Sequence, residues 1–137
     1  MIYSRTIPVE FNHCDPAGIV FYPRYFEMTN SVVENFFREV VLHPFAAMMA
    51  AGEGVPTARV ATDFHAPSRL GDLLDWRLSV ARLGRSSVGF ALDAWCEETR
   101  RVSVELVLVG VGPDGQPRPW SDPIRSRIAS FMEAENA

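Results

Sequence analysis

The sequence contains little cysteine, no long apolar run and no excess of positive charge. Its two cysteines, Cys14 and Cys96, lie far apart and form no CxxC pair, so a disulfide framework is not expected. No run of about 18 uncharged apolar residues occurs, so we expect no membrane-spanning helix. The formal net charge of −4 argues against a general nucleic-acid-binding protein, although it leaves room for a small basic pocket.

The beginning of the chain also lacks the apolar segment and small-residue cleavage site of a secretory signal peptide. We therefore expect a cytoplasmic protein with reduced thiols. Internal repeats, low-complexity tracts and linkers are absent, so residues 1–137 are expected to form a single domain. At 137 residues, of which 47% are hydrophobic, the chain is long enough to build one hydrophobic core.

One segment has the spacing of a long amphipathic helix. Apolar residues recur at three- and four-residue steps from Tyr25 to Val40, and charged residues such as Glu27 and Glu34 take the other side. This spacing predicts a helix of about 17 residues that opens at Pro23 and ends before Pro44. A short helix over 45–51 and a terminal helix over 122–135 are also expected.

Apolar and polar residues alternate in five other ranges, which predicts strands over 7–11, 55–65, 73–83, 87–96 and 102–111. A strand, a long helix and four strands joined by hairpins indicate an α+β fold with a mainly antiparallel sheet. The helix can cover only one face of this sheet. Because residues 105–109 are apolar at nearly consecutive positions, we expect a second subunit to bury the other face.

The segment His13–Pro23 combines a carboxylate, a tight turn and a helix start. Asp15 stands a few residues before the helix, whose free N–H groups form a ready oxyanion site. A carboxylate beside such a site can attack an acyl group or activate water while the N–H groups hold the oxyanion. Gly18 lets the chain turn tightly and lets a substrate approach. From the residues alone, a structural role for Asp15 as the cap of a turn is the commoner case.

The string DPAGIVFYPRYF at residues 15–26, followed by a long helix and four strands, resembles the 4-hydroxybenzoyl-CoA thioesterase branch of the hot-dog fold. Pro67, Gly71 and Asp72, and the turn at 84–87, also fall where that family has its turns. The resemblance covers nearly the whole chain. It implies a long central helix wrapped by a mainly antiparallel five-stranded sheet, and an enzyme that hydrolyses acyl-CoA thioesters.

The resemblance also implies a set of site residues. The catalytic aspartate maps onto Asp15, as nucleophile or general base, and the N–H that polarises the thioester carbonyl maps onto Tyr22. Arg85 and Ser86 match the turn that holds the coenzyme A nucleotide. Arg118 is expected to meet a coenzyme A phosphate, because a guanidinium binds phosphate through two hydrogen bonds. Solvated surface charge is the alternative for each arginine.

One position departs from the family. Asn30 stands where the 4-hydroxybenzoyl enzymes have a helix aspartate that recognises the ring hydroxyl. A neutral amide can form a hydrogen bond but cannot accept a proton. Asn30 therefore argues against a 4-hydroxybenzoyl substrate, but it does not argue against thioester hydrolysis. An exposed polar residue on the helix is the alternative for Asn30. The resemblance implies no cofactor or metal, a coenzyme A or acyl carrier protein substrate, and a site between subunits of a homodimer or homotetramer.

A dehydratase or hydratase and a non-catalytic binding subunit are the alternative functions. A hot-dog dehydratase or hydratase wants a histidine paired with an acid, which is not evident, and a non-catalytic acyl-thioester-binding subunit has no use for Asp15. Neighbours in an extended chain point to opposite faces, so His13, Cys14 and Asp15 are not expected to form a triad. The histidines and aspartates show no recognised metal-ligand spacing, so no metal site is expected.

Overall fold

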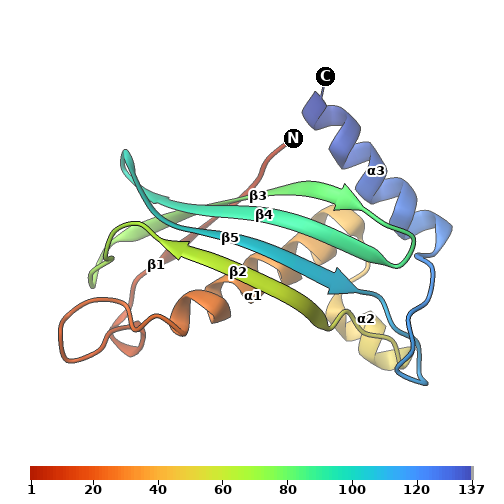
Figure 1. Cartoon of the computed structure of the whole chain (residues 1–137), viewed down its shortest axis with the longest axis horizontal. Helices are drawn as coiled ribbons and strands as arrows, with labels where there is room; N and C mark the ends of the chain where they lie inside the picture. Colours follow the sequence, from red (N-terminus) through yellow and green to blue (C-terminus); the bar gives the residue numbers. More distant parts are fainter. Residues whose placement is uncertain (137) are drawn as a thin grey trace.

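A five-stranded antiparallel sheet curves around one long helix (Figure 1). The computed structural model describes the backbone of residues 1–136 and the side chains of residues 1–133. The sheet has the strand order β1-β3-β4-β5-β2, so that β1 and β2 form its two edges. The strands are β1 (Tyr3–Pro8), β2 (Thr57–Phe64), β3 (Leu73–Leu83), β4 (Ser87–Cys96) and β5 (Thr99–Val109). The predicted α+β architecture is confirmed.

The central helix begins as α1 (Arg24–Phe36) and continues without a break as a π-helical turn, η2 (Phe37–Val41). The next residue, Leu42, has a left-handed φ of 58°, which ends the helix. Two further helices follow, α2 (Phe45–Ala50) and α3 (Asp122–Asn136). Among the residues that the structure describes, no helix is long and apolar enough to cross a membrane.

The core lies between the apolar side of α1 and the inner face of the sheet. The ring of Phe36 is packed edge-on against Phe90 of β4, with centroids 5.4 Å apart, and against Phe131 of α3 at 5.1 Å. Each such side chain contributes about 1.5–3 kcal/mol when it is fully removed from water. The largest fully buried side chains are Trp76, Phe36, Phe37, Phe90, Leu74, Leu78, Leu92 and Ile128.

Two predicted boundaries are wrong. The first strand lies at Tyr3–Pro8 rather than 7–11, because Glu10 precedes a 3-10 turn, η1 (Phe11–His13), which cannot continue the ladder. The last strand begins at Thr99 rather than at 102, because the turn before it contains only residues 97 and 98. Glu97 adopts a left-handed φ of 55°, so the chain reverses within two residues and β5 begins at Thr99.

The outer face of the sheet is less apolar than the sequence suggested. Val107 and Val109 are half-buried, but Glu105, which precedes them on the same face of β5, is exposed, and its carboxylate lies 3.6 Å from the guanidinium of Arg59 of β2. Strand neighbours further along this face carry charged side chains too, such as Asp93. The outer face thus carries both apolar and charged side chains. That a second subunit covers it stays a prediction.

A side chain at Gly110 would clash with a buried aromatic ring. A Cβ there would lie 2.8 Å from Cζ3 of Trp120, and this ring is buried and donates its N–H to the carbonyl of Ser87 at 3.0 Å. Because the ring cannot easily move away, we expect Gly110→Ala to lower the free energy of unfolding by about 1–3 kcal/mol, measured by urea denaturation.

Gly89→Ala is the matched control, since a Cβ at Gly89 would meet nothing closer than 3.7 Å. Its effect should be small. Equal destabilisation by both substitutions would show that the Trp120 contact is not the cause.

Candidate active site

Asp15 opens a tight turn between η1 and the start of α1. Its Oδ1 accepts the N–H of Ala17 at 2.9 Å, and its carbonyl accepts the N–H of Gly18 at 2.9 Å. Gly18 has a φ of +80°, a conformation that L side chains rarely adopt. Asp15 is half-buried, and its Oδ2 forms no hydrogen bond with any residue that the structure describes. One oxygen thus caps the turn and the other is free for chemistry.

Residues on both sides hold the Asp15 turn in place. Cys14 and Val20 form an antiparallel bridge across it, and the N–H of Val20 donates to the carbonyl of Ser68 at 2.8 Å. Ser68 is fully buried, and its Oγ accepts the hydroxyl of Tyr25 at 2.9 Å. Burial raises the pKa of the Tyr25 hydroxyl, so this group remains a neutral donor. The turn is therefore tied to both α1 and the segment around Ser68.

The helix start leaves one backbone donor without a partner. The N–H of Arg24 donates to the carbonyl of Phe21 at 2.9 Å, and the N–H of Tyr25 donates to that of Tyr22 at 3.2 Å. Pro23 has no N–H. The N–H of Tyr22 finds no acceptor within the described part of the chain, and the residue is 58% exposed. It is thus a free backbone donor at this end of α1.

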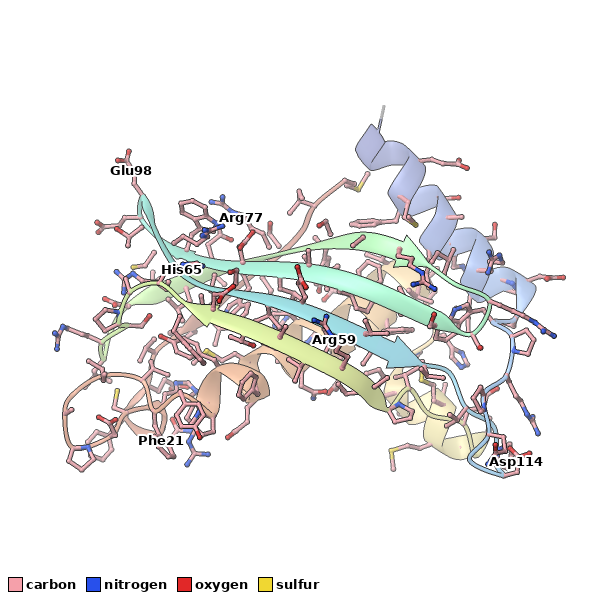
Figure 2. All side chains as sticks on the ribbon, viewed as in Figure 1. Phe21, Arg59, His65, Arg77, Glu98 and Asp114 are labelled. Carbon is pink, nitrogen blue, oxygen red and sulfur yellow. The ribbon has the colours of Figure 1, made fainter. Side chains whose placement is uncertain are left out.

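Aromatic rings join the helix start to the end of β2. The ring of Tyr22 lies edge-on to Phe21 and Phe64, with centroids 5.6 Å and 6.1 Å apart, and Tyr25 packs on Phe64 at 5.9 Å. Figure 2 shows Phe21 beside the start of α1 and His65 just beyond the end of β2. The residues 15–22 therefore lie at the C-terminal end of β2.

Arg101 of β5 supports the same end of the fold, and sequence reasoning missed it. Its guanidinium donates to Oδ2 of Asp72 at 2.8 Å and to the carbonyl of Pro67 at 2.9 Å, which clamps the segment that carries Ser68. The backbone N–H of Arg69, followed by the Arg101 guanidinium, holds the pKa of the Asp72 carboxyl below its ordinary value of 3.8. Arg101 and Asp72 are 29 residues apart, so only the strand register reveals their contact.

Asn30 lines an apolar cavity of about 160 Å³ between α1 and the strands β2 and β5. Asn30 and Thr57 are polar residues of its wall, and the side chain of neither forms a hydrogen bond to another described residue. Thr29 also lines the cavity, but its hydroxyl already donates to the carbonyl of Tyr25 at 2.8 Å. The apolar part of the wall comes from Phe26, Val33, Phe45, Val55, Val60, Leu106 and Leu108.

Arg85, Ser86 and Arg118 lie together where β5 leaves the sheet. The carbonyl of Ser86 accepts the N–H of Gly110 at 2.7 Å, and the N–H of Arg118 donates to the carbonyl of Gly110 at 2.9 Å. The carbonyl of Arg85 accepts the N–H of Trp120 at 3.0 Å. Both arginines are exposed, and neither guanidinium forms an ion pair within residues 1–133.

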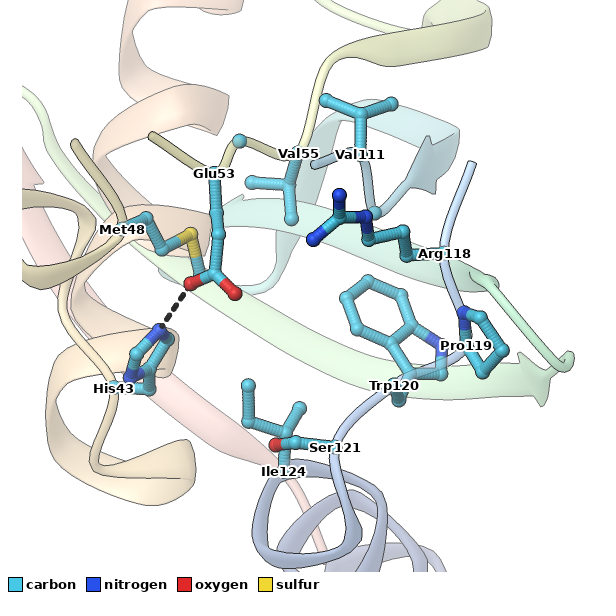
Figure 3. Close-up of a pocket in the computed structure, with 12 residues that line it drawn as sticks. His43, Met48, Glu53, Val55, Val111, Arg118, Pro119, Trp120, Ser121 and Ile124 are labelled. Atoms are coloured by element: carbon cyan, nitrogen blue, oxygen red, sulfur yellow. Dashed lines mark hydrogen bonds and ion pairs between the residues drawn. The ribbon is translucent and has the colours of Figure 1, made fainter. Parts of the chain in front are cut away.

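The Arg118 guanidinium points into a small pocket of about 120 Å³ (Figure 3). The ring of Trp120 lies beneath it, and across the pocket Glu53 contacts Nε2 of His43 at 3.3 Å. The Arg118 side chain packs directly against Gly112, where a Cβ would clash with the Nε of Arg118. A free guanidinium next to an aromatic ring suits a phosphate or a flat heterocycle.

Within one chain, the predicted site residues other than Asn30 fall into two separate groups. The ring contact of Tyr22 places the Asp15 group at the Phe64 end of β2, whereas the bridge between Gly54 and Val111 places the Arg118 group at the Thr57 end. The length of β2 separates these ends by about 23 Å. Figure 2 shows the same separation between Phe21 and Asp114.

The other combinations that the sequence offered do not form. Nδ1 of His13 accepts the N–H of Glu10 at 2.8 Å, and Sγ of Cys14 contacts the carbonyl of Glu10 at 3.7 Å, so neither is aligned with Asp15 as a triad. Within the described residues, no three His, Cys, Asp or Glu side chains gather into a metal site.

The Asp72 clamp makes stability depend on pH. Because its folded pKa is lowered, the carboxylate stabilises the fold above its unfolded pKa near 3.8, and this contribution is lost as the pH falls through the lower folded value. We expect Asp72→Asn to cost about 1–3 kcal/mol at neutral pH, measured by urea denaturation, and the difference from the native protein to shrink below pH 3.8.

Asp75→Asn serves as the control, because its carboxylate pairs with Arg77 at 3.0 Å on the exposed outer face. An exposed pair of this kind contributes about 0–1 kcal/mol. If the two variants lost the same stability at the same pH, the Asp72 clamp would have no special role.

Comparison with known proteins places the chain in a family. The family model described as the thioesterase superfamily matches residues 17–103, more than half of the chain, and Asp15 lies two residues before this match. A sequence comparison with curated proteins finds no match.

Solved structures share the fold at low sequence identity. A hypothetical protein from Staphylococcus aureus, solved in complex with CoA, has a TM-score of 0.91 and 16% identity, covering 97% of this chain and 85% of its own. A 1,4-dihydroxy-2-naphthoyl-CoA thioesterase from Synechocystis has a TM-score of 0.87 and 17% identity, covering 96% and 98%. A gentisyl-coenzyme A thioesterase has a TM-score of 0.83 and 23% identity, covering 89% and 98%. The predicted hot-dog fold is thus confirmed, and the chain belongs to the thioesterase superfamily.

Proposed function

We propose that the protein hydrolyses an acyl-CoA thioester with Asp15 as the reacting carboxylate and the N–H of Tyr22 as the oxyanion donor. The observation that carries this proposal is the pairing, on one clamped loop, of a carboxylate oxygen and a backbone N–H that both lack partners in the described structure. Tyr22 is 58% exposed and Asp15 is half-buried, so a bound thioester can reach both groups. The superfamily to which the chain belongs supports the same reaction.

Two routes use these groups in the same positions. In one, Asp15 attacks the thioester carbonyl, the carbon–sulfur bond breaks, and water then hydrolyses the mixed anhydride. In the other, Asp15 takes a proton from water, and the resulting hydroxide attacks. In both routes the Tyr22 N–H stabilises the negative charge on the carbonyl oxygen, and the products are a free acid and coenzyme A.

The complete site is assembled from two chains. The outer edge of β2 pairs with no strand of its own chain, and it carries Val60 and Phe64, which are 47% and 51% exposed. If a two-fold axis pairs this edge with its copy, the Phe64 end of one chain meets the Thr57 end of the other. Asp15 and Tyr22 of one protomer then approach Arg85, Ser86 and Arg118 of its partner, which bind the phosphates of coenzyme A.

The acyl group occupies the cavity beside Asn30. Its volume of about 160 Å³ matches that of an engineered cavity that binds benzene, so a group of about one ring fits. The free amide of Asn30 offers a neutral hydrogen bond to a hydroxyl or carbonyl substituent. Two of the structural neighbours are thioesterases for ring-bearing acyl groups, naphthoyl and gentisyl, which supports a ring here as well.

A hydratase receives no comparable support. Its chemistry needs a histidine paired with an acid, and the pair that the described residues form, His43 with Glu53 at 3.3 Å, lies in the Arg118 pocket, away from Asp15. His65 contacts the hydroxyl of Ser103 at 2.8 Å instead of an acid. A non-catalytic acyl-thioester-binding subunit would make no use of the free carboxylate oxygen of Asp15.

Replacing Asp15 with asparagine separates its two roles. The asparagine carbonyl can still accept the Ala17 N–H and cap the turn, but the side chain can neither attack nor take a proton. We therefore expect Asp15→Asn to fold normally and to lose about 100-fold or more in kcat, measured as thiol release from an acyl-CoA.

Asp114→Asn is a closely matched control. Oδ1 of Asp114 accepts the N–H of Gln116 at 3.0 Å, the same turn bond that Asp15 makes to Ala17, but Asp114 lies at the far end of the fold. Asp114 lies in the turn that leads to Arg118, near the proposed phosphate-binding residues but not among the reacting groups. This variant should therefore keep the native kcat, with any change confined to KM. Full hydrolysis by Asp15→Asn would refute the proposed role of Asp15.

A thiol-release screen tests the acyl cavity. We expect single-ring acyl-CoA substrates to give a higher kcat/KM than long-chain ones, and Asn30→Leu to lower kcat/KM for hydroxylated rings by about tenfold with a smaller effect on unsubstituted rings. A preference for long chains, or an equal effect of Asn30→Leu on both rings, would contradict this assignment.

A further inference from the structure

Arg5 is a cation on the inner, apolar face of β1. Tyr3, Arg5 and Ile7 are the half-buried positions of this strand, and the ring of Tyr3 packs on Phe36 of α1 at 5.8 Å. The Nε of Arg5 is sealed from solvent and has no hydrogen-bond acceptor. Its guanidinium forms no ion pair with a residue that the structure describes. A donor nitrogen that is sealed from water normally has an acceptor, so the Nε of Arg5 is unusual.

The residue that pairs with Arg5 on the neighbouring strand also carries a buried donor without an acceptor. Arg5 pairs in register with Trp76 of β3, and cross-strand partners place their side chains on the same face about 5 Å apart. Trp76 is fully buried, yet its indole N–H has no acceptor either. In the described part of the chain, the other buried side-chain nitrogen or oxygen atoms without a hydrogen-bond partner belong to Thr62 and Arg101. Arg5 and Trp76 are thus cross-strand neighbours that each carry a buried donor without an acceptor, and of the two only Arg5 lines a cavity that a ligand can enter.

The space for such a ligand is a groove between β1 and α1. A cavity of about 270 Å³ is lined there by Arg5 together with His13, Glu27, Met28 and Ser31. The hydroxyl of Ser31 forms no hydrogen bond to a described residue. His13 accepts the Glu10 N–H on Nδ1, which leaves its Nε2 as a donor. Two carboxylates also line the groove, and both have partners: the Glu10 side chain accepts the backbone N–H of His13, and Glu27 pairs with Arg24 at 2.6 Å. The groups of the lining without a described partner are therefore the donors of Arg5, Ser31 and His13.

This groove is separate from the proposed acyl cavity. Residues 27, 28 and 31 line the groove, whereas residues 26, 29, 30 and 33 line the acyl cavity. With 3.6 residues per turn, these two sets lie on opposite sides of α1. One faces the β1 edge of the sheet, and the other faces the β2 edge.

We propose that the groove between β1 and α1 is a second ligand site, which binds an anionic oxygen group, a carboxylate or a phosphate, on the guanidinium of Arg5 with help from Ser31 and His13. The site adjoins the catalytic loop, because the carbonyl of His13 accepts the N–H of Phe21 at 2.9 Å, one residue before Tyr22. An anion bound there lies next to the loop that carries Tyr22, the proposed oxyanion donor. Both products of thioester hydrolysis carry such groups.

Nuclear magnetic resonance of the full-length protein tests this directly. Inorganic phosphate and benzoate are titrated separately at constant ionic strength, with chloride as the compensating anion. We expect the Arg5 Nε–H and the Trp76 indole N–H signals to shift saturably with at least one of the two anions. Saturation by phosphate alone identifies a phosphate site, and saturation by benzoate alone identifies a carboxylate site.

Arg5→Gln should weaken binding by about tenfold or more, since it removes a charged hydrogen-bond donor. Arg82→Gln is the control, because Arg82 lies opposite Gly89 on the outer face of the sheet. If Arg5→Gln does not fold, Ser31→Ala replaces it, with a weaker but measurable loss of affinity. The absence of a saturable shift with either anion, or a shift that Arg5→Gln and Ser31→Ala leave unchanged, would overturn the proposal.

The outcome is independent of the proposed activity. Repeating the titration with Asp15→Asn should give the same affinity, because Asp15 does not line the groove. A protein without thioesterase activity that still binds the anion would refute the proposed function and leave this site standing.

Discussion

The burial of α1 against the inner face of the sheet is the constraint on which the rest of the structure depends. Val32 and Phe36 are completely buried between the helix and the strands, so the helix can neither rotate nor slide without exposing them. Its first residues are thereby fixed at the end of β2, where the N–H of Tyr22 stays free. The same position leaves a cavity on each side of the helix, one toward β2 and one toward β1.

A second layer of polar contacts turns this fixed helix into a candidate site. Arg101 clamps Asp72 and Pro67, the buried Ser68 accepts the Tyr25 hydroxyl, and the carbonyl of Ser68 holds Val20. None of these groups is proposed to touch the substrate. They act by holding the turn of Asp15, because a displacement of about 1 Å at a reacting group is enough to cost much of the rate.

Local patterns predicted the central helix, four of the five strands within a few residues, and the loop that carries Asp15. These features depend on neighbours in sequence, such as the helical spacing after Tyr25 and the turn residues up to Gly18. Contacts that depend on strand register could not be predicted. The clamp between Arg101 and Asp72 and the neighbouring donors of Arg5 and Trp76 are of this kind. The first strand was misplaced because an alternating pattern does not show where a ladder ends.

The separation of Asp15 from Arg118 along β2 has a consequence for the assembly. In one chain the two groups lie at opposite ends of an edge strand whose outer side is unpaired. We propose a two-fold pairing of that edge, in which one copy supplies the carboxylate and the other supplies the arginines. The open edge, the exposed Val60 and Phe64, and the divided site thus have one common explanation.

Complementation between two impaired variants tests this account most directly. Asp15→Asn and Arg118→Gln are each expressed alone and then together, and mixed dimers are purified with two different affinity tags. If the site is shared between chains, a mixed dimer contains one intact site, and we expect about half of the native kcat with the native KM for acyl-CoA. If each chain forms its own site, no intact site exists in the mixed dimer, and a KM as high as that of Arg118→Gln alone would contradict the account.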